Sequence, residues 1–404
     1  MKPISFIPSL TPLRGIAATL VVLFHFDLFI GPIAPVGNMM VDKLYLMVDL
    51  FFVLSGFIMY HVYGSWFAGG VGQERFLDFM KARFARLYPL HLFMLIYMVG
   101  WACALWVQLD NSAIPEIVQS ILDPKAIPTS LLLVQAWGMH FNAPWNTASW
   151  SISVEWLLYL AFPFLVLFMA RFKASAKWIL TGVSISGLLL IMYWIQPQYE
   201  LLFAQEFGLE GGRGPKNTID LITGPALLRG LCGFIAGMIA YEAYQQQWMK
   251  SVLQKGFWFL SLFLFMFALW IGDLLPDVVA VALFAILILH AAYVEGLTKR
   301  ILNNKVFSYL GDISFSIYMV HIPLILSFFM YNMMQGNMPD PGAETSAEVN
   351  WIGNWIGALI FLAISIGVAS LTYRFIELPM RRKLKAYFLG SKSQLASPEV
   401  VKNI

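Results

Sequence analysis

Ten apolar runs, each about as long as a membrane-spanning helix, constrain the fold of this chain more than any other feature. A helix that crosses a hydrocarbon core of about 30 Å needs roughly 20 residues. Backbone groups cannot stay unpaired in lipid, so runs of this length must be helices rather than open strands. The sequence therefore predicts an all-α polytopic membrane protein, a bundle of about ten transmembrane helices at about 14–31, 44–64, 87–108, 149–170, 177–195, 221–245, 256–272, 277–294, 313–333 and 351–374.

Composition excludes several other classes of protein. Only 12% of the 404 residues are charged, against roughly 25% in a soluble domain. The net charge of +3 provides no broad basic field, so no nucleic acid partner is expected. Cys103 and Cys232 both lie inside apolar runs. The chain therefore has neither a disulfide framework nor the spacing of a metal site, and we expect no metal.

The distribution of basic residues predicts the orientation of the spans. Of the 26 Lys and Arg residues, 21 fall in the loops on one side of the predicted spans and four on the other. Basic loops stay in the cytoplasm, so both termini are expected there. The first apolar run ends at Gly31-Pro32 without a cleavage site and is expected to be a retained span. We predict a transmembrane domain over 1–385 and a polar cytoplasmic tail over 386–404, in a multi-pass protein of the bacterial inner membrane.

The first predicted span carries two ionisable residues on one helix face. Arg14 and His25 are eleven residues apart in LRGIAATLVVLFH, which is about three turns, with a rise of roughly 16 Å. Arg14 is therefore expected at the cytoplasmic mouth and His25 near the middle of the membrane. Ionisable residues at that depth indicate function. The alternative is an arginine that reaches back to the membrane surface and a core histidine bonded to a carbonyl group.

Carboxylates enter the predicted bundle from the outer side in two other spans. Asp49 lies in VDLFFVLSGFIMYHV, and Glu155 lies in ASWSISVEW beside Ser151 and Ser153. Both are about 8–9 Å below that boundary at roughly 1.5 Å per residue, a depth from which either could reach His25. We expect Asp49 to orient the imidazole, because a carboxylate on one ring nitrogen raises the basicity of the other. Glu155 and the two serines are expected to contact the hydroxyl groups of an acceptor.

Further candidates lie inside or beside other spans. Arg83 and Arg86 share a helix face in KARFARLYPLH, and each guanidinium can bind phosphate oxygens in a forked geometry. A basic cluster that only stops membrane transfer is the alternative. Arg229 in the sixth span and His321 in the ninth are candidate supporting residues. We also expect an ion pair between Arg374 and Glu377, interfacial positions for His61 and His91, and close helix packing at Ser55 and Gly56.

The long segments 109–148, 196–220 and 334–350 are predicted on the outer side. They are rich in acidic and amide side chains. Such segments could cover an acceptor site, although ordinary solvated loops would have the same composition.

Taken together, these motifs resemble those of the integral-membrane acyltransferase family three. The resemblance rests on LRGIAATLVVLFH, VDLFFVLSGF, RFARLYP, SWSISVEW, LRGLCGFIAGM, ISFSIYMVHIP and YRFIELPMRR, in the order of the family. It implies a ten-helix bundle that transfers acyl groups, often acetyl, from cytoplasmic acyl-CoA to hydroxyl groups of cell-envelope glycans or related acceptors. It also implies that His25 is the catalytic base, that Arg14 is essential beside it, and that Arg83 and Arg86 face the CoA. Longer members carry a further extracytoplasmic domain after the bundle.

The expected function is therefore O-acyl transfer with His25 as general base. Acyl-CoA would be the co-substrate and no cofactor would be tightly bound. The partners would be a glycan or lipid-linked sugar acceptor and the lipid bilayer, and the oligomeric state is open. Two alternatives come from other classes: a proton-coupled transporter or lipid flippase, in which His25, Asp49 and Glu155 form a proton relay, and a membrane scaffold.

Overall fold

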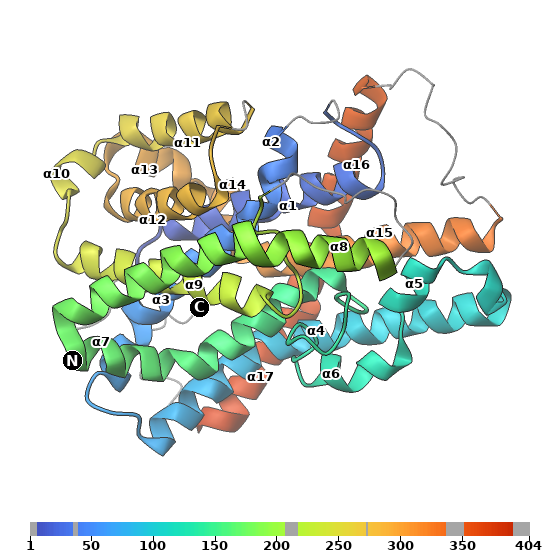
Figure 1. Cartoon of the computed structure of the whole chain (residues 1–404), viewed down its shortest axis with the longest axis horizontal. Coiled ribbons are helices and arrows are strands. Elements are labelled where there is room, and N and C mark those ends of the chain that lie inside the picture. The colour runs from blue at the N-terminus through green and yellow to red at the C-terminus, as the bar shows by residue number, and fades with distance from the viewer. Residues whose placement is uncertain (1–5, 35–38, 207–216, 272–273, 337–350, 391–404) are drawn as a thin grey trace.

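The computed structural model describes residues 6–34, 39–206, 217–271, 274–336 and 351–390, which form helices and loops with no strand among them (Figure 1). The first half contains α1 (Leu10–Phe29), α2 (Met39–Asp42), η1 (Lys43–Leu46), α3 (Met47–Phe67), α4 (Gln73–Gln108), η2 (Asn111–Ala113), α5 (Glu116–Ile121), η3 (Pro124–Ala126), α6 (Ile127–Leu131) and η4 (Thr147–Ser149). The remainder contains α7 (Trp150–Leu190), η5 (Ile191–Ile195), α8 (Gln196–Glu206), α9 (Ala226–Gln245), α10 (Lys250–Leu253), α11 (Gly256–Ile271), α12 (Asp277–Tyr293), α13 (Gly296–Leu302), α14 (Lys305–Asp312), α15 (Ser314–Met334), α16 (Trp351–Thr372), η6 (Tyr373–Glu377) and α17 (Leu378–Leu389).

The prediction of an all-α membrane protein is confirmed, with fewer full-length spans than expected. Eight helices in the described residues are long and apolar enough to cross a membrane, or nine if α12 and α13, which bend by 102° at their junction, form one span. The expected number was about ten. The difference arises at α11 and α12, which have 16 and 17 residues, fewer than the roughly 20 that a crossing needs. In Figure 1, α11, α12 and α13 lie together at one edge of the molecule.

Several boundaries differ from the expected ones. The third span was predicted from residue 87, but α4 begins at Gln73, so Arg83 and Arg86 lie well inside a helix of 36 residues. The predicted fourth span and most of the fifth are both part of α7. α17 continues to Leu389, past the predicted start of the tail at residue 386. Residues 391–404 of that tail, and 207–216 and 337–350 of the outer segments, lie outside the described residues.

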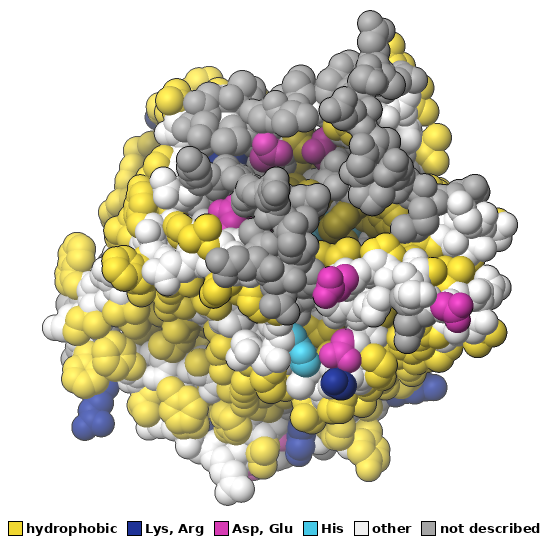
Figure 2. Space-filling view, turned by 45° about the vertical axis from the view of Figure 1, so that its right-hand side comes forward, with side chains coloured by type: hydrophobic (Ala, Val, Ile, Leu, Met, Phe, Trp, Pro, Cys, Tyr) yellow, Lys and Arg dark blue, Asp and Glu magenta, His cyan; other side chains and the backbone are white. Residues whose placement is uncertain are grey.

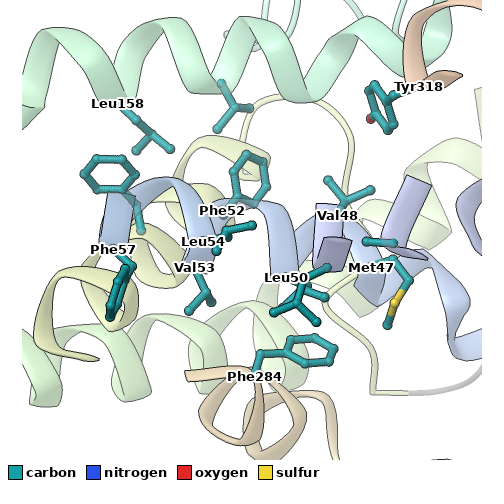
Figure 3. Packing of buried hydrophobic residues seen from close by; sticks show 14 of the residues in the cluster. Met47, Val48, Leu50, Phe52, Val53, Leu54, Phe57, Leu158, Phe284 and Tyr318 are labelled. Carbon is teal, nitrogen blue, oxygen red and sulfur yellow. The ribbon is translucent and has the colours of Figure 1, made fainter. Parts of the chain in front are cut away.

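Two helices, α3 and α15, lie at the centre of the bundle. In each of these helices, 72% of the most apolar 18-residue stretch is buried inside the protein. The corresponding share in the segment Ile352–Leu389 is only 22%. A helix that is apolar on all sides is stable in such a position because every face meets protein. Figure 3 shows Phe52, Val53 and Phe57 of α3 among side chains from α7, α12 and α15. These two central helices supply much of the wall of the cavity described below.

Glycines allow α3 and α9 to pack backbone to backbone. A Cβ atom on Gly56 of α3 would lie 1.9 Å from the carbonyl oxygen of Phe234, and one on Gly237 of α9 would lie 1.9 Å from that of Val53. Small residues at such crossings are typical of membrane helices, where close packing drives association. The packing expected at Gly56 is therefore present, and it fixes α3 against α9.

Candidate active site

A cavity with about 790 Å³ of empty space lies between α1, α3, α4, α7 and α15. Most of its wall is apolar, but four charged side chains line it: Arg14 from α1, Arg83 and Arg86 from α4, and Glu155 from α7. Three guanidinium groups against one carboxylate give the cavity an excess of positive charge. Charges act strongly in such low-dielectric surroundings, so the cavity is suited to an anionic ligand.

The two arginines of α4 are held by buried partners. Arg83 is 1% exposed; its Nη2 donates to the Tyr63 hydroxyl at 2.8 Å, and its guanidinium lies 5.0 Å from the centre of that ring. Arg86 donates through Nη1 to Oε1 of Glu377. The other oxygen of Glu377 accepts a hydrogen bond from Ser316 at 2.7 Å. These contacts fix both guanidinium groups in the cavity wall.

The ion pair predicted between Arg374 and Glu377 is wrong. Glu377 pairs with Arg86, and Arg381 lies 3.9 Å away. The prediction placed the residues by their spacing on an α-helix, but Tyr373–Glu377 is a π-helical segment, which changes the face on which each side chain lies.

Glu155 lies in the cavity wall with the arginines. Its Oε1 accepts hydrogen bonds from Ser55 at 2.9 Å and from Tyr159 at 2.5 Å. Ser151, Glu155 and Tyr159 are spaced four residues apart, so they share one face of α7 and line the cavity together. Ser153 lies on another face, where it binds the backbone amide of Ala136. The prediction grouped Ser153 with Ser151 and Glu155 by their depth in the membrane. It did not consider that Ser153 points from a different face of α7.

His25 contacts a second histidine, His321 of α15. His25 Nδ1 lies 3.2 Å from His321 Nε2 and 3.0 Å from the carbonyl oxygen of Val21. His321 is fully buried, and its Nδ1 lies 3.3 Å from the carbonyl oxygen of Ile317. Within the described part of the chain, His25 Nε2 has no hydrogen-bond partner. Residues 296 positions apart in the sequence thus form one imidazole pair.

Tyr318 connects this pair to the cavity. It lines the cavity, and the centre of its ring is 5.7 Å from that of His321. Its hydroxyl accepts from Ser151 at 2.8 Å and donates to the carbonyl oxygen of Ala148 at 2.8 Å. Tyr318 was not among the residues predicted from the sequence. Its position three residues before His321, on the same helix face, was the available signal.

The predicted contact between Asp49 and His25 is wrong, because Asp49 binds Arg229. Arg229 donates from Nε and Nη2 to the two carboxylate oxygens of Asp49 at 3.0 and 2.7 Å, and both side chains are fully buried. Its Nη1 also reaches Asp220 at 3.0 Å. Asp49 and Arg229 therefore connect α3 and α9 and are not part of the cavity wall. Asp49 and Arg229 lie at similar depth. A guanidinium group can bind both oxygens of a carboxylate, which favours Arg229 over an imidazole as the partner of Asp49.

Two other titratable residues lie in different surroundings. His91, expected near the cytoplasmic end of its span, is buried halfway along α4 and binds the carbonyl oxygen of Ser130 at 2.7 Å. Asp312 at the end of α14 is half-buried near Arg14. Burial raises the pKa of this carboxyl group, while the guanidinium groups of Arg14, Arg381 and Arg86 lower it. Asp312 therefore lies within the electropositive field around the cavity.

Comparison with known proteins places these residues in a family. Residues 7–374 match the model of an acyltransferase domain. The acyltransferase MdmB of Streptomyces mycarofaciens is 26% identical over 94% of this chain and 92% of its own length. Protein 2 in the picA locus of Rhizobium radiobacter is 36% identical over 36% of this chain and 72% of its own length.

A further relative is longer than this chain. The peptidoglycan O-acetyltransferase OatA of Listeria monocytogenes is 23% identical over 96% of this chain, which spans 58% of the length of OatA. No solved structure matches the chain. The family model covers nearly all the helices that build the cavity and the histidine pair. The chain is therefore a multi-pass membrane O-acyltransferase and belongs to the integral-membrane acyltransferase family three.

Proposed function

We propose that this protein transfers an acyl group, most simply acetyl, from acyl-CoA to a hydroxyl group of a cell-envelope glycan, with His25 as the general base. The observation that carries the proposal is the position of the histidine pair. His321 lies one helical turn beyond Tyr318, a residue of the arginine-lined cavity wall, and its imidazole contacts that of His25.

The charge of the cavity wall supports acyl-CoA as the donor. The phosphates of the CoA head group are anionic, and Arg14, Arg83 and Arg86 outnumber Glu155 in the wall. The largely apolar remainder of the wall suits the pantetheine arm. Acyl-CoA is cytoplasmic, so the proposal includes a bacterial inner membrane with the cavity open to the cytoplasm.

The hydrogen bonds of the two histidines support His25 Nε2 as the basic atom. A carbonyl oxygen only accepts, so the contacts to Val21 and Ile317 place a proton on Nδ1 of each ring. His321 Nε2 then carries a lone pair and accepts from His25 Nδ1. The lone pair of His25 lies on Nε2, the atom without a partner in the described residues. In this proposal, neutral His321 orients the imidazole of His25, the role that we expected for Asp49.

The reaction then proceeds by direct transfer. The acceptor oxygen attacks the thioester carbonyl carbon while His25 Nε2 takes the hydroxyl proton, and a new C–O bond forms. The tetrahedral intermediate collapses with cleavage of the C–S bond, and the proton on His25 passes to the leaving sulfur to give CoA–SH. A positioned base of this kind contributes about 10²–10⁴-fold to the rate. His321 stabilises the imidazolium form of His25 between the two steps.

The name of OatA supports the acceptor class, since that relative is a peptidoglycan O-acetyltransferase. We propose a glycan or lipid-linked sugar presented from the outer side of the membrane. Ser151 lines the cavity and hydrogen-bonds to Tyr318. We propose that it contacts the acceptor hydroxyl.

The proposal is tested with the full chain in membranes that contain envelope material as the acceptor. Radiolabelled acetyl-CoA is supplied from the cytoplasmic side, and incorporation of label into the glycan is measured. His25→Gln is expected to lower incorporation at least 100-fold, while His61→Gln, a matched change in α3 outside the cavity wall, keeps it. Incorporation above a tenth of the wild-type rate in His25→Gln excludes His25 as the base.

The donor site is tested separately by the thermal shift that CoA produces in the purified protein. Arg83→Gln is expected to reduce the shift. The control is Arg75→Gln, which changes an exposed arginine that binds the carbonyl oxygen of Trp66 and lies outside the cavity wall. An unchanged shift in Arg83→Gln would place the donor elsewhere.

A further inference from the structure

A second, larger groove lies at the far end of α4 from the arginines. It has about 1,770 Å³ of empty space and is formed by the end of α4, by α5 and by residues 139–142. Acidic side chains, a histidine and a basic side chain lie close together on the face of the molecule that carries α5 (Figure 2). The polar side chains of the groove include Asp110, Glu116, Gln119, Asp123, Lys125 and Asn142.

The groove and the first cavity carry charge of opposite sign. Three carboxylates, Asp110, Glu116 and Asp123, line the groove against one ammonium group, that of Lys125. The first cavity has three guanidinium groups and one carboxylate. An anion such as CoA is therefore repelled from the groove. A neutral ligand rich in hydroxyl groups is not repelled, because carboxylates and amides accept hydrogen bonds from its hydroxyl groups.

The length of α4 separates the groove from the arginines of the first cavity. Arg86 lines the cavity and Trp106 lines the groove, and twenty helical residues correspond to a rise of about 30 Å. This is the thickness of the hydrocarbon core. Because the basic loops predict that the Arg86 end is cytoplasmic, the groove opens on the outer side.

The wall of the groove is held in place by buried contacts. Trp145, which is 1% exposed, donates from its backbone amide to the carbonyl oxygen of Ile121 at 2.7 Å and from its indole to that of Asp123 at 3.2 Å. Asn142 Nδ2 donates to the Ser120 hydroxyl at 2.7 Å. These contacts tie 139–145 to α5 and to the residues after it. The polar side chains of the groove therefore project from a backbone that these hydrogen bonds hold in place.

The same segment leads to the histidine pair. Asn146 follows the groove residues by four positions and donates from Nδ2 to the carbonyl oxygen of Met319 at 2.9 Å. Met319 is two residues before His321. Four residues span at most about 14 Å, so a short segment links the groove to the part of α15 just before His321.

From these observations we infer that the groove binds an uncharged oligosaccharide segment of the acceptor. The partly exposed ring of Trp106 offers an apolar face for a sugar ring, and Glu116, Gln119 and Asn142 bind its hydroxyl groups. The inference rests on the proposed function for the identity of the ligand as the acceptor. It adds a binding site about 30 Å along α4 from Arg86.

The test uses the full chain in nanodiscs, with tetra-N-acetylchitotetraose as a neutral probe and titration calorimetry as the measurement. Trp106→Ala and Glu116→Gln are expected to raise the Kd at least fivefold. Trp178→Ala and Glu74→Gln change an exposed tryptophan on α7 and an exposed glutamate at the other end of α4, and they are expected to bind like the wild type. The CoA thermal shift should stay unchanged in all four variants.

The outcomes separate this inference from the proposed function. If the wild type does not bind the probe at millimolar concentration, or if the groove variants bind it like the wild type, the inference is wrong. In that case, transfer of acetyl that depends on His25 would leave the proposed function intact. If the probe binds at the groove but CoA gives no thermal shift, the donor proposal is wrong and the oligosaccharide site remains.

Discussion

At the scale of single residues, the imidazole pair is the feature on which the proposed chemistry depends. His25 alone, on an apolar helix, could hold its proton on either ring nitrogen. In the proposed function, the contacts to Val21 and His321 favour a proton on Nδ1, so that Nε2, which has no partner among the described residues, accepts the proton. A neutral partner fits this membrane-buried position because it avoids a further buried charge, whose transfer from water is costly.

Substitution of His321 is expected to slow the chemical step without weakening donor binding. His321→Phe removes the lone pair that stabilises the protonated His25, so kcat should fall about 10²-fold while KM for acetyl-CoA stays near its wild-type value. The acid limb of the pH–rate profile should also move to lower pH. His321→Gln retains an acceptor oxygen and is expected to restore part of kcat. An unchanged pH profile in His321→Phe would reduce His321 to a packing role.

Asp49 is expected to affect stability rather than chemistry. Asp49→Asn leaves the guanidinium of Arg229 buried with its main partner neutralised, and breaking a buried ion pair in this way costs about 3–5 kcal/mol. The melting temperature in nanodiscs should fall, and the pH–rate profile of the remaining folded protein should not move. The double variant Asp49→Asn, Arg229→Gln should regain part of the lost stability. A shifted pH profile with an unchanged melting temperature would show that Asp49 takes part in the chemistry.

At the scale of helices, hydropathy and spacing within one helix predicted more than contacts between helices. Each expected apolar run falls on a helix, and the spacing of Arg14 and His25 correctly places them on one helix. The start of α4 was missed because charged residues from Arg75 to Arg86 lower its hydropathy, although this part of the helix packs inside the protein. The partners of His25 and Asp49 are 296 and 180 residues away. Depth in the membrane does not say which helices are neighbours.

The crossing of α3 and α9 is expected to be intolerant of any side chain at Gly56. Gly56→Ala would place a Cβ atom against the carbonyl oxygen of Phe234, so the two helices must separate and the cavity wall on α3 must shift. We expect a lower melting temperature and a smaller CoA thermal shift. Gly182→Ala in α7 is the control, since a Cβ atom at that position would have nothing within 4 Å, and a helical Gly-to-Ala change favours folding by roughly 0.5–1 kcal/mol. Equal stability of the two variants would contradict the close crossing.

At the scale of the whole molecule, the proposed function and the proposed groove divide the reaction between two compartments. A positive cavity toward one end of α4 and an acidic groove at the other match an anionic donor and a neutral acceptor. Helices α1 and α15 carry His25 and His321. In the proposed reaction the acyl group would cross the membrane within the protein, while CoA and glycan stay on their own sides.

This division requires a definite orientation, which cysteine labelling can measure. Ser112, just after α4, and Ser251 in α10 are both exposed, and the basic loops predict that they lie outside and inside the cell respectively. In a Cys103→Ala background, an impermeant maleimide should label Ser112→Cys in intact cells and Ser251→Cys only after permeabilisation. Cys232 is buried and serves as the unlabelled internal control. Reversed labelling would put the arginine-lined cavity on the side that lacks acyl-CoA, and both the donor assignment and the glycan groove would then be untenable.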